Sequence, residues 1–370
     1  MRAVVAAGGS RLAELFAPRD LGSRDNALNM LRLVLASLVV FSHVHILSGT
    51  GDGVMWEGQH LGSWAVVGFF TISGFLITGA RCRSKAGTYL INRVVRIFPG
   101  YLLVLVLVAF GLAPIAQVVE HGSLDGYLST PVTPVQYIWV NSLLTMGSYS
   151  IGETLTTSPY GTAWNGSLWS LYYEFMCYIV IGVFMSWRWT RERAWPVIAL
   201  FVLSVLVHAG IDRISPYTGG DGSLALFIFM FPYFMGGAVI YVLRDRLPMR
   251  AWIALLAAII SYALIALLPD VGKQAASPFM AYLILWLGAV LPSPRVTRVH
   301  DISYGVYIFH FPLTQLLLVS VGAHWGFTTL LVVVMACTLV LATLSWVLVE
   351  RAAMRWSRGR SPWAELSLHA

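Results

Sequence analysis

Charged residues are scarce in this sequence. Asp, Glu, Lys and Arg together make up 11% of its 370 residues, whereas hydrophobic residues make up 58%. A soluble globular domain carries about 25% charged residues, because its surface must be hydrated. The composition therefore excludes an ordinary soluble protein and predicts an integral membrane protein that crosses the bilayer several times.

Cysteine is also rare. The three cysteines, Cys82, Cys177 and Cys337, show no paired spacing, which excludes a disulfide framework, and we predict no metal site. The first 28 residues are too polar for a signal peptide, so the first apolar segment is expected to direct membrane insertion. No fused soluble domain is expected at either end.

Long apolar runs are abundant, and most are long enough for about 30 Å of hydrocarbon. They predict an all-α membrane protein with ten transmembrane helices, at residues 29–48, 62–80, 97–114, 168–187, 195–211, 223–243, 251–268, 277–291, 303–320 and 327–349. The stretch 134–149 is apolar but short and contains Asn141. We expect it to form a re-entrant or interfacial helix.

The basic residues set the orientation. With ten spans and a cytoplasmic N-terminus, all of the 24 Lys and Arg residues except Arg213 and Lys273 fall on the cytoplasmic side. Both termini are therefore predicted to be cytoplasmic. The net charge of +7 needs only anionic lipid as a partner, and no nucleic acid.

This orientation also divides the chain. It predicts a cytoplasmic segment at 1–28, a membrane domain at 29–349 with an extracytoplasmic segment at 115–167, and a basic cytoplasmic tail at 350–370.

Arg32 and His43 stand eleven residues apart in the first predicted span. That spacing places both on one helix face, about 16 Å apart along the axis. Arg32 would then lie near the cytoplasmic surface, where a snorkelling arginine is the simpler interpretation. His43 would lie in the outer half, as a proton carrier or as a histidine that hydrogen-bonds a neighbouring helix. His45 faces away.

Arg93 and Arg96 are one turn apart in the third span. Two guanidiniums on one face suit a polyphosphate that arrives from the cytoplasm. The preference of cytoplasmic helix ends for basic residues explains them equally well.

A carboxylate in the fourth span, Glu174, is expected at nearly the depth of His43. It must be neutral or paired there, with His43 or a substrate hydroxyl as its partner. In the ninth span, Tyr307 and His310 are one turn apart, and His310 is predicted to line the same cavity as His43. Small residues in the second span, including Ser73, favour close helix packing or leave room for a slender thioester chain.

These motifs together resemble the acyltransferase-3 family of integral membrane proteins. The resemblance rests on "LRLVLASLVVFSHV", "GFFTISGFLI", "RVVRIFPGYL", "NGSLWSLYYEF" and "SYGVYIFHFPL", which follow one another along most of the chain. It implies a stand-alone bacterial inner-membrane enzyme that moves an acyl group, most often acetyl, from acyl-CoA to an extracytoplasmic or lipid-linked saccharide. A homodimer is compatible with it.

The resemblance also implies residue roles. His43 corresponds to the catalytic histidine and Arg32 to its companion, while Arg93 and Arg96 correspond to an arginine pair that engages the donor. Glu174 occupies the acid position of the Trp-Ser-Leu motif, where we expect it to orient the imidazole. Ser73, Tyr307 and His310 are further donor-site candidates.

One motif departs from the family. Its members often carry Glu-x-Pro after the last span, whereas Glu350 is followed here by Arg351 and no proline, which weakens any role for Glu350. A proton-coupled transporter or flippase would also place His, Glu and Arg inside spans, and it is the alternative function.

Overall fold

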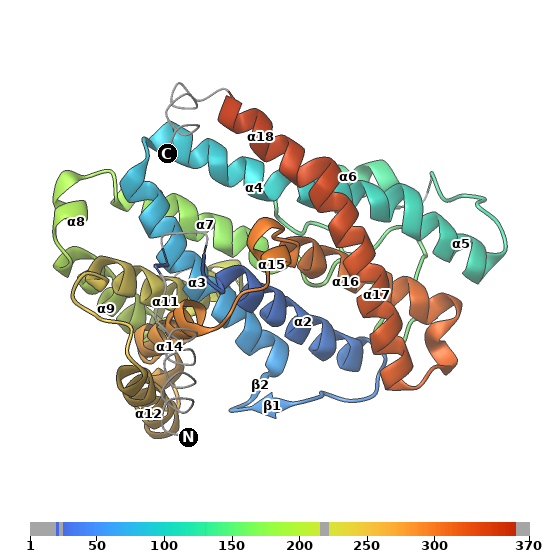
Figure 1. Ribbon diagram of the computed structural model, residues 1–370. Helices are drawn as coiled ribbons and strands as arrows, with labels where there is room; N and C mark the ends of the chain where they lie inside the picture. The colour runs from blue at the N-terminus through green and yellow to red at the C-terminus, as the bar shows by residue number, and fades with distance from the viewer. Residues whose placement is uncertain (1–19, 22–24, 130, 215–221, 360–370) are drawn as a thin grey trace, which may run out of the picture. The chain divides into compact units, whose positions relative to one another are not determined.

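The computed structural model describes residues 20–21, 25–129, 131–214 and 222–359. This part of the chain is mostly helical (Figure 1). Its strands are a short hairpin, β1 (Met55–Trp56) with β2 (Gln59–His60). The predicted all-α class is confirmed.

Every predicted transmembrane stretch coincides with a helix, and the predicted limits mostly agree to within a few residues. Five helical segments are long and apolar enough to cross a membrane: Leu28–Leu47, Leu61–Arg83, Ala86–His121, Gly222–Leu243 and Phe327–Ser357. Shorter apolar helices, such as Trp195–Ala209, account for others of the ten. The chain is thus a helical membrane protein, while the count of ten spans and the cytoplasmic termini stay predictions.

The segment predicted as re-entrant or interfacial contains α6 (Pro134–Asn141). Thr133 caps its start by accepting from the Gln136 amide at 3.1 Å. The Asn141 side chain then bonds both the amide and the carbonyl of Ser148 and closes a loop. Eight residues of helix rise only about 12 Å, which is too short to span the bilayer.

The chain forms two compact units, which are described separately. Unit 1 comprises residues 1–32, 67–89 and 176–300, and unit 2 comprises 33–66, 90–175 and 301–370. Four helices contribute residues to both: α2 (Leu28–Leu47), α3 (Leu61–Arg83), α4 (Ala86–Leu107) and α7 (Trp169–Phe184).

Unit 1 is built around α11, which packs against α9 and α14. Its own elements are α8 (Arg188–Glu192), α9 (Trp195–Ala209), α10 (Ile211–Ile214), α11 (Gly222–Leu243), α12 (Ala251–Leu267), α13 (Gly272–Ala275), α14 (Ser277–Val290) and α15 (Arg295–Val299). Helix α3 crosses α11 at very short range, since a Cβ added to Gly74 would lie 1.8 Å from the Phe234 carbonyl oxygen. Close packing is therefore the structural reason for this glycine.

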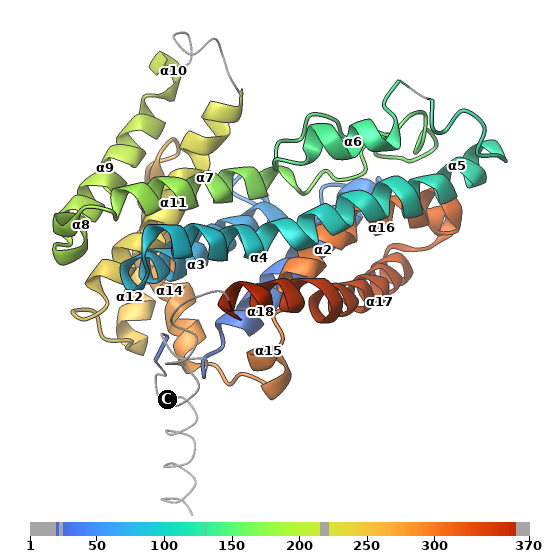
Figure 2. The ribbon, with the colours of Figure 1, turned by 90° about the horizontal axis from the view of Figure 1, so that it is seen from above.

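Unit 2 is built around α16, which packs along α17 (Figures 1 and 2). Besides the hairpin and α6, its own elements are η1 (Val108–Leu112), α5 (Ala113–His121), α16 (Ser303–Ser320), η3 (Gly322–His324), α17 (Phe327–Ser345), η4 (Trp346–Glu350) and α18 (Arg351–Gly359). Gly305 allows the tight α16–α17 crossing, because a Cβ there would lie 2.7 Å from the Ala342 Cα.

Two π-helical turns interrupt otherwise continuous helices in unit 2. The segment η1 joins α4 to α5, and η4 joins α17 to α18. A π-turn inserts an extra residue into the helical repeat and changes the face that the following residues present. The second of these turns ends at Glu350, which is buried.

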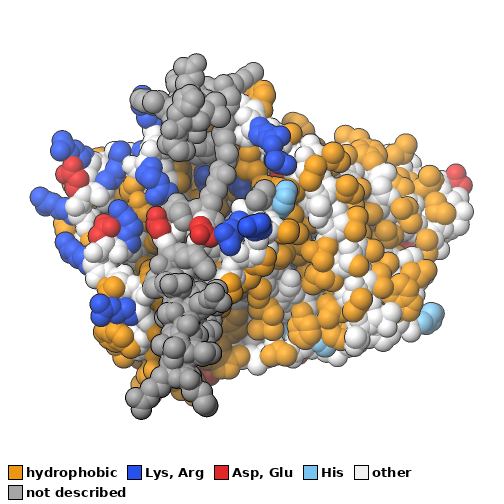
Figure 3. Space-filling view, viewed as in Figure 1, with side chains coloured by type: hydrophobic (Ala, Val, Ile, Leu, Met, Phe, Trp, Pro, Cys, Tyr) orange, Lys and Arg blue, Asp and Glu red, His pale blue; other side chains and the backbone are white. Residues whose placement is uncertain are grey.

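Apolar side chains cover much of the surface that Figure 3 shows. On α17, Val332, Val340 and Leu344 are large hydrophobic residues that remain exposed. An exposed apolar surface of this kind is normal only where lipid, and not water, is the solvent.

Candidate functional site

Two histidines from distant parts of the chain meet inside unit 2. Nδ1 of His43 on α2 lies 2.7 Å from Nε2 of His310 on α16, and the rings stack with centroids 5.0 Å apart. His310 is completely buried, whereas His43 is only partly buried. We call these two residues the histidine pair.

The contact made by the second ring nitrogen of His310 determines which nitrogens of the histidine pair carry a hydrogen. Nδ1 of His310 lies 3.2 Å from the Val306 carbonyl oxygen, which can only accept a hydrogen bond. In the neutral state, His310 Nδ1 therefore carries the hydrogen and Nε2 is an acceptor. His43 Nδ1 must then donate to His310, so the lone pair of His43 is on Nε2.

Aromatic and polar contacts hold the pair in place. The Phe311 ring meets the His43 ring edge-on, with centroids 5.4 Å apart. The backbone of Gly166 lies directly against Phe311, since an added Cβ would be 2.4 Å from its Cζ. The Tyr307 hydroxyl, one turn from His310, donates to the Ser167 carbonyl at 2.7 Å and lies 2.5 Å from the Ser170 hydroxyl. The "NGSLWS" and "SYGVYIFHFPL" motifs thus pack together.

The connection that precedes α7 packs against this part of α16. The Gln315 amide donates to the carbonyls of Gly161 and Ala163, and its oxygen accepts from the Ser158 hydroxyl at 2.6 Å. Within the same connection, the Tyr160 ring contacts Phe311 with centroids 5.9 Å apart and remains 48% exposed. Residues 158–163 therefore pack against the part of α16 that contains Phe311 and Gln315, next to the histidine pair.

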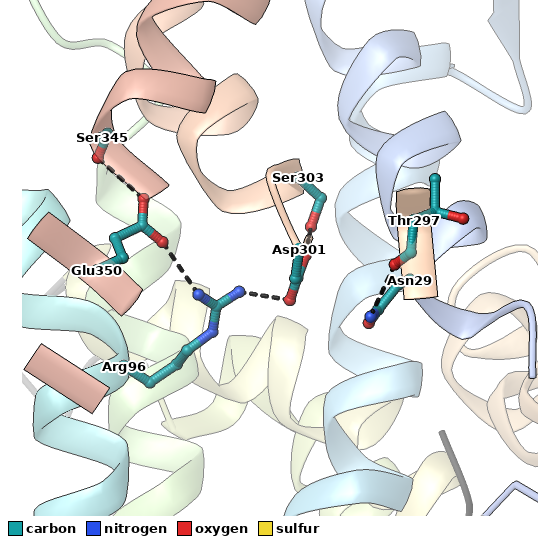
Figure 4. A network of polar contacts seen from close by, with 7 residues as sticks. All are labelled: Asn29, Arg96, Thr297, Asp301, Ser303, Ser345 and Glu350. Carbon is teal, nitrogen blue, oxygen red and sulfur yellow. Dashed lines mark hydrogen bonds and ion pairs between the residues drawn. The ribbon is translucent and has the colours of Figure 1, made fainter. Parts of the chain in front are cut away.

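Arg96 is held by protein carboxylates. Figure 4 shows its guanidinium between Asp301 and Glu350, with N–O distances of 2.5 Å and 3.0 Å. The rings of Tyr304 and Trp346 flank it, with centroids 5.5 Å and 5.7 Å from the guanidinium carbon. We call Arg96, Asp301 and Glu350 the Arg96 network. It ties together α4, the start of α16 and η4.

Both carboxylates of this network have further support. Asp301 accepts from the Ser303 hydroxyl at 2.6 Å, and Glu350 accepts from the Ser345 hydroxyl at 2.9 Å. Ser345 and Glu350 are five residues apart, which is the spacing across one π-helical turn, so η4 brings their side chains together. Glu350 thus has structural partners, Arg96 and Ser345. The missing proline had weakened any role expected for Glu350.

The other predicted residues lie in both units. Arg93 and Glu174 are partly buried in unit 2. Arg32 and the buried Ser73 belong to unit 1, where the Arg32 guanidinium carbon lies 6.0 Å from the Phe69 ring centroid. At Nδ1 of His43 the partner is His310, and the orienting role of Glu174 stays a prediction. The roles of the remaining residues stay predictions.

Sequence reasoning did not foresee the His43–His310 contact or the two carboxylates on Arg96. The pairing joins residues 267 positions apart, which no local pattern reveals. One signal was present in the sequence. A histidine inside a membrane-spanning helix needs a hydrogen-bond partner, and only a few of the predicted spans contain a titratable side chain that could be that partner.

The comparisons with known proteins agree with this architecture. The family model described as an acyltransferase domain (acyltransferase-3) matches residues 25–348. An O-acetyl transferase of Shigella phage Sf6 is 27% identical over 343 residues, covering 89% of this chain and 96% of the relative. Nodulation protein 10 of Rhizobium leguminosarum bv. viciae is 29% identical over 361 residues, covering 90% and 94%. No solved structure matches the chain.

Proposed function

Because the chain belongs to the acyltransferase-3 family and is therefore an enzyme that transfers acyl groups, we propose that it is a transmembrane O-acyltransferase. It takes an acyl group, most simply acetyl, from cytoplasmic acyl-CoA. It delivers that group to a hydroxyl of an extracytoplasmic or lipid-linked saccharide, in the bacterial inner membrane. Family membership favours this function over the transporter alternative.

The observation that carries the proposal is the histidine pair. His43 is partly accessible and has its lone pair on Nε2, while His310 holds Nδ1 from the buried side. An imidazole fixed in this tautomer is ready to take a proton or to attack a carbonyl carbon. When His43 becomes positively charged during the reaction, His310 Nε2 continues to accept its Nδ1 hydrogen, which stabilises the cation.

Two routes use this nitrogen. In the first, Nε2 takes the hydroxyl proton as the acceptor oxygen attacks the thioester carbonyl, the C–S bond breaks, and the CoA thiolate receives that proton. In the second, Nε2 itself attacks, and CoA leaves as the thiolate. The hydroxyl oxygen then displaces the imidazole from the acyl carbon, and its proton goes to the thiolate.

Donor and acceptor approach from opposite sides in this proposal. Arg93, on α4, contacts a phosphate of acyl-CoA near the cytoplasmic surface. Helix α2 rises about 16 Å between positions 32 and 43, which is the reach of a pantetheine arm. Arg96 has a structural role beside Arg93. Its two terminal NH2 groups are engaged by Asp301 and Glu350, so it fixes α4, the helix that carries both arginines.

The test compares two histidines of one helix. Inside-out membrane vesicles that contain the native glycans receive radiolabelled acetyl-CoA, and label in the saccharide fraction is counted. His43→Ala should abolish transfer, while His45→Ala, whose ring stacks on Phe327 instead, should retain most of it. Transfer by the His43→Ala variant at the wild-type rate would remove His43 from the mechanism.

A second experiment separates the two routes. Purified enzyme and labelled acetyl-CoA are mixed without acceptor, and CoA release is followed in the first turnover. One equivalent of CoA with label bound to the protein supports acylation of His43, whereas no release supports direct transfer.

A further inference from the structure

Unit 1 contains a group of arginines that has a very different environment from that of Arg96. Arg81 lies in the last turn of α3, Arg191 lies on α8, and Arg244 follows α11. Arg81 and Arg191 both donate to Ser186, and Arg244 stacks on Tyr241, whose ring packs against Gly79, two residues before Arg81. We call these three residues the arginine cluster.

Arg81 is the buried member, with only 3% of its surface exposed. Its guanidinium donates to the carbonyls of Gly182 and Ser84 at 2.9 Å and 2.8 Å, and to the Ser186 hydroxyl at 3.0 Å. All three acceptors are neutral. Among the described residues no carboxylate pairs with Arg81.

Arg191 adds a second charge at the exposed end of the cluster. It donates to the carbonyls of Met185 and Ser186 at 2.6 Å and 3.0 Å, and it too lacks a carboxylate partner in the described part of the chain. A guanidinium has five N–H groups, so most of those on Arg191 stay available. Figure 3 shows other Lys and Arg side chains over α8 as well.

Arg244 is only weakly neutralised. It stacks on the Tyr241 ring with its guanidinium carbon 4.2 Å from the centroid, and its ion pair with Asp245 is long, at 3.4 Å. The Asp245 side chain is 80% exposed, so water screens this pair strongly.

The carbonyl groups that Arg81 and Arg191 contact lie at or just after helix C-termini: those of Gly182, Met185 and Ser186 at the end of α7, and that of Ser84 after α3. A helix C-terminus carries about half a negative charge, which explains part of the attraction. This partial charge does not balance the full positive charges of Arg81, which is buried, and Arg191. Gathering like charges in a partly buried place is unfavourable unless an anion joins them.

We propose that the arginine cluster binds a phosphate group. Forked guanidinium donors match phosphate oxygens, and Arg191 leaves the site open at its outer end. The phosphate belongs either to an anionic lipid headgroup or to a free nucleotide such as CoA. The cluster belongs to unit 1 and shares no residue with the histidine pair, and the proposal stands without the proposed acyl transfer.

The test uses the purified protein in nanodiscs of phosphatidylcholine, and binding is read from the rise in thermal unfolding midpoint. One arm adds phosphatidylglycerol to the discs, and the other adds CoA to discs of pure phosphatidylcholine. The two arms distinguish the sources of phosphate. We expect the wild-type protein to respond in at least one arm.

The variants locate the response. Arg191→Gln should weaken binding about tenfold or more, because it removes charge-assisted hydrogen bonds. Arg193→Gln, a change in an exposed arginine two residues away, should leave it within about twofold. Arg191 is exposed, so the variant is expected to fold, and its unfolding midpoint without ligand checks this.

Two results would overturn the proposal. One is a wild-type protein that responds to neither probe. The other is an Arg191→Gln protein that binds as the wild type does, which would place any phosphate elsewhere. Neither result depends on acyl transfer, so the proposed function is tested separately.

Discussion

The two units of this protein treat a largely buried arginine in opposite ways. In unit 2, Arg96 lies between two carboxylates and two aromatic rings. In unit 1, Arg81 is more deeply buried, yet all its described acceptors are neutral oxygens. The difference teaches that the position of an arginine in a helix does not reveal its role. Its partners decide whether it holds the fold together or attracts a ligand.

The largest expected effect comes from removing the buried carboxylate of the Arg96 network. Glu350→Ala should lower the free energy of unfolding by about 3–5 kcal/mol, because it strips a partner from a charge held inside the protein. Unfolding in mixed micelles with increasing sodium dodecyl sulfate measures this. Arg96→Met combined with Glu350→Leu should recover part of the loss, and a single variant as stable as the wild type would contradict the network.

A smaller effect is expected at the other carboxylate. Asp301→Asn keeps an oxygen for the Ser303 hydroxyl but removes the charge that faces Arg96. The free energy of unfolding should fall by about 1.5–3 kcal/mol, the range for hydrogen bonds to charged groups. The same micelle titration checks it, with Asp245→Asn, a change in an exposed pair, as the control. A loss equal to that of Glu350→Ala would show that the deeper burial of Glu350 does not give it the larger contribution to stability.

The smallest effect is expected in unit 1. Ser186→Ala removes a neutral acceptor of Arg81, and a neutral hydrogen bond contributes only about 0.5–1.5 kcal/mol. The free energy of unfolding in neutral detergent should fall by that amount. Should the loss reach that of Glu350→Ala, Arg81 would be as firmly built into the fold as Arg96, and the contrast between the units would disappear.

Helix positions could be predicted from the sequence because each run of apolar residues is bounded by charged or turn-forming residues. Helix α16 matches the predicted 303–320, and α12 and α14 match to within one residue. The full length of the third span could not be foreseen, since the helix begins at Ala86 and continues through the π-turn η1 to His121, past Gln117 and Glu120.

The candidate site was predictable residue by residue but not as an arrangement. His43 and His310 were both singled out, yet their contact depends on the tertiary packing of α2 and α16 within unit 2. Arg96 was assigned to the donor because its charge was visible in the sequence. Its neutralising carboxylates, Asp301 and Glu350, lie more than 200 positions away and give no local signal.

The most direct test of the central claim, that His310 holds His43 with its lone pair on Nε2, is the turnover number of two variants at position 310. His310→Gln retains an oxygen that can accept the Nδ1 hydrogen, so it should keep most of the activity. His310→Leu cannot accept it and should lose about 100-fold in kcat with an unchanged KM for acetyl-CoA. Equal loss in both variants, or wild-type turnover in His310→Leu, would contradict the account.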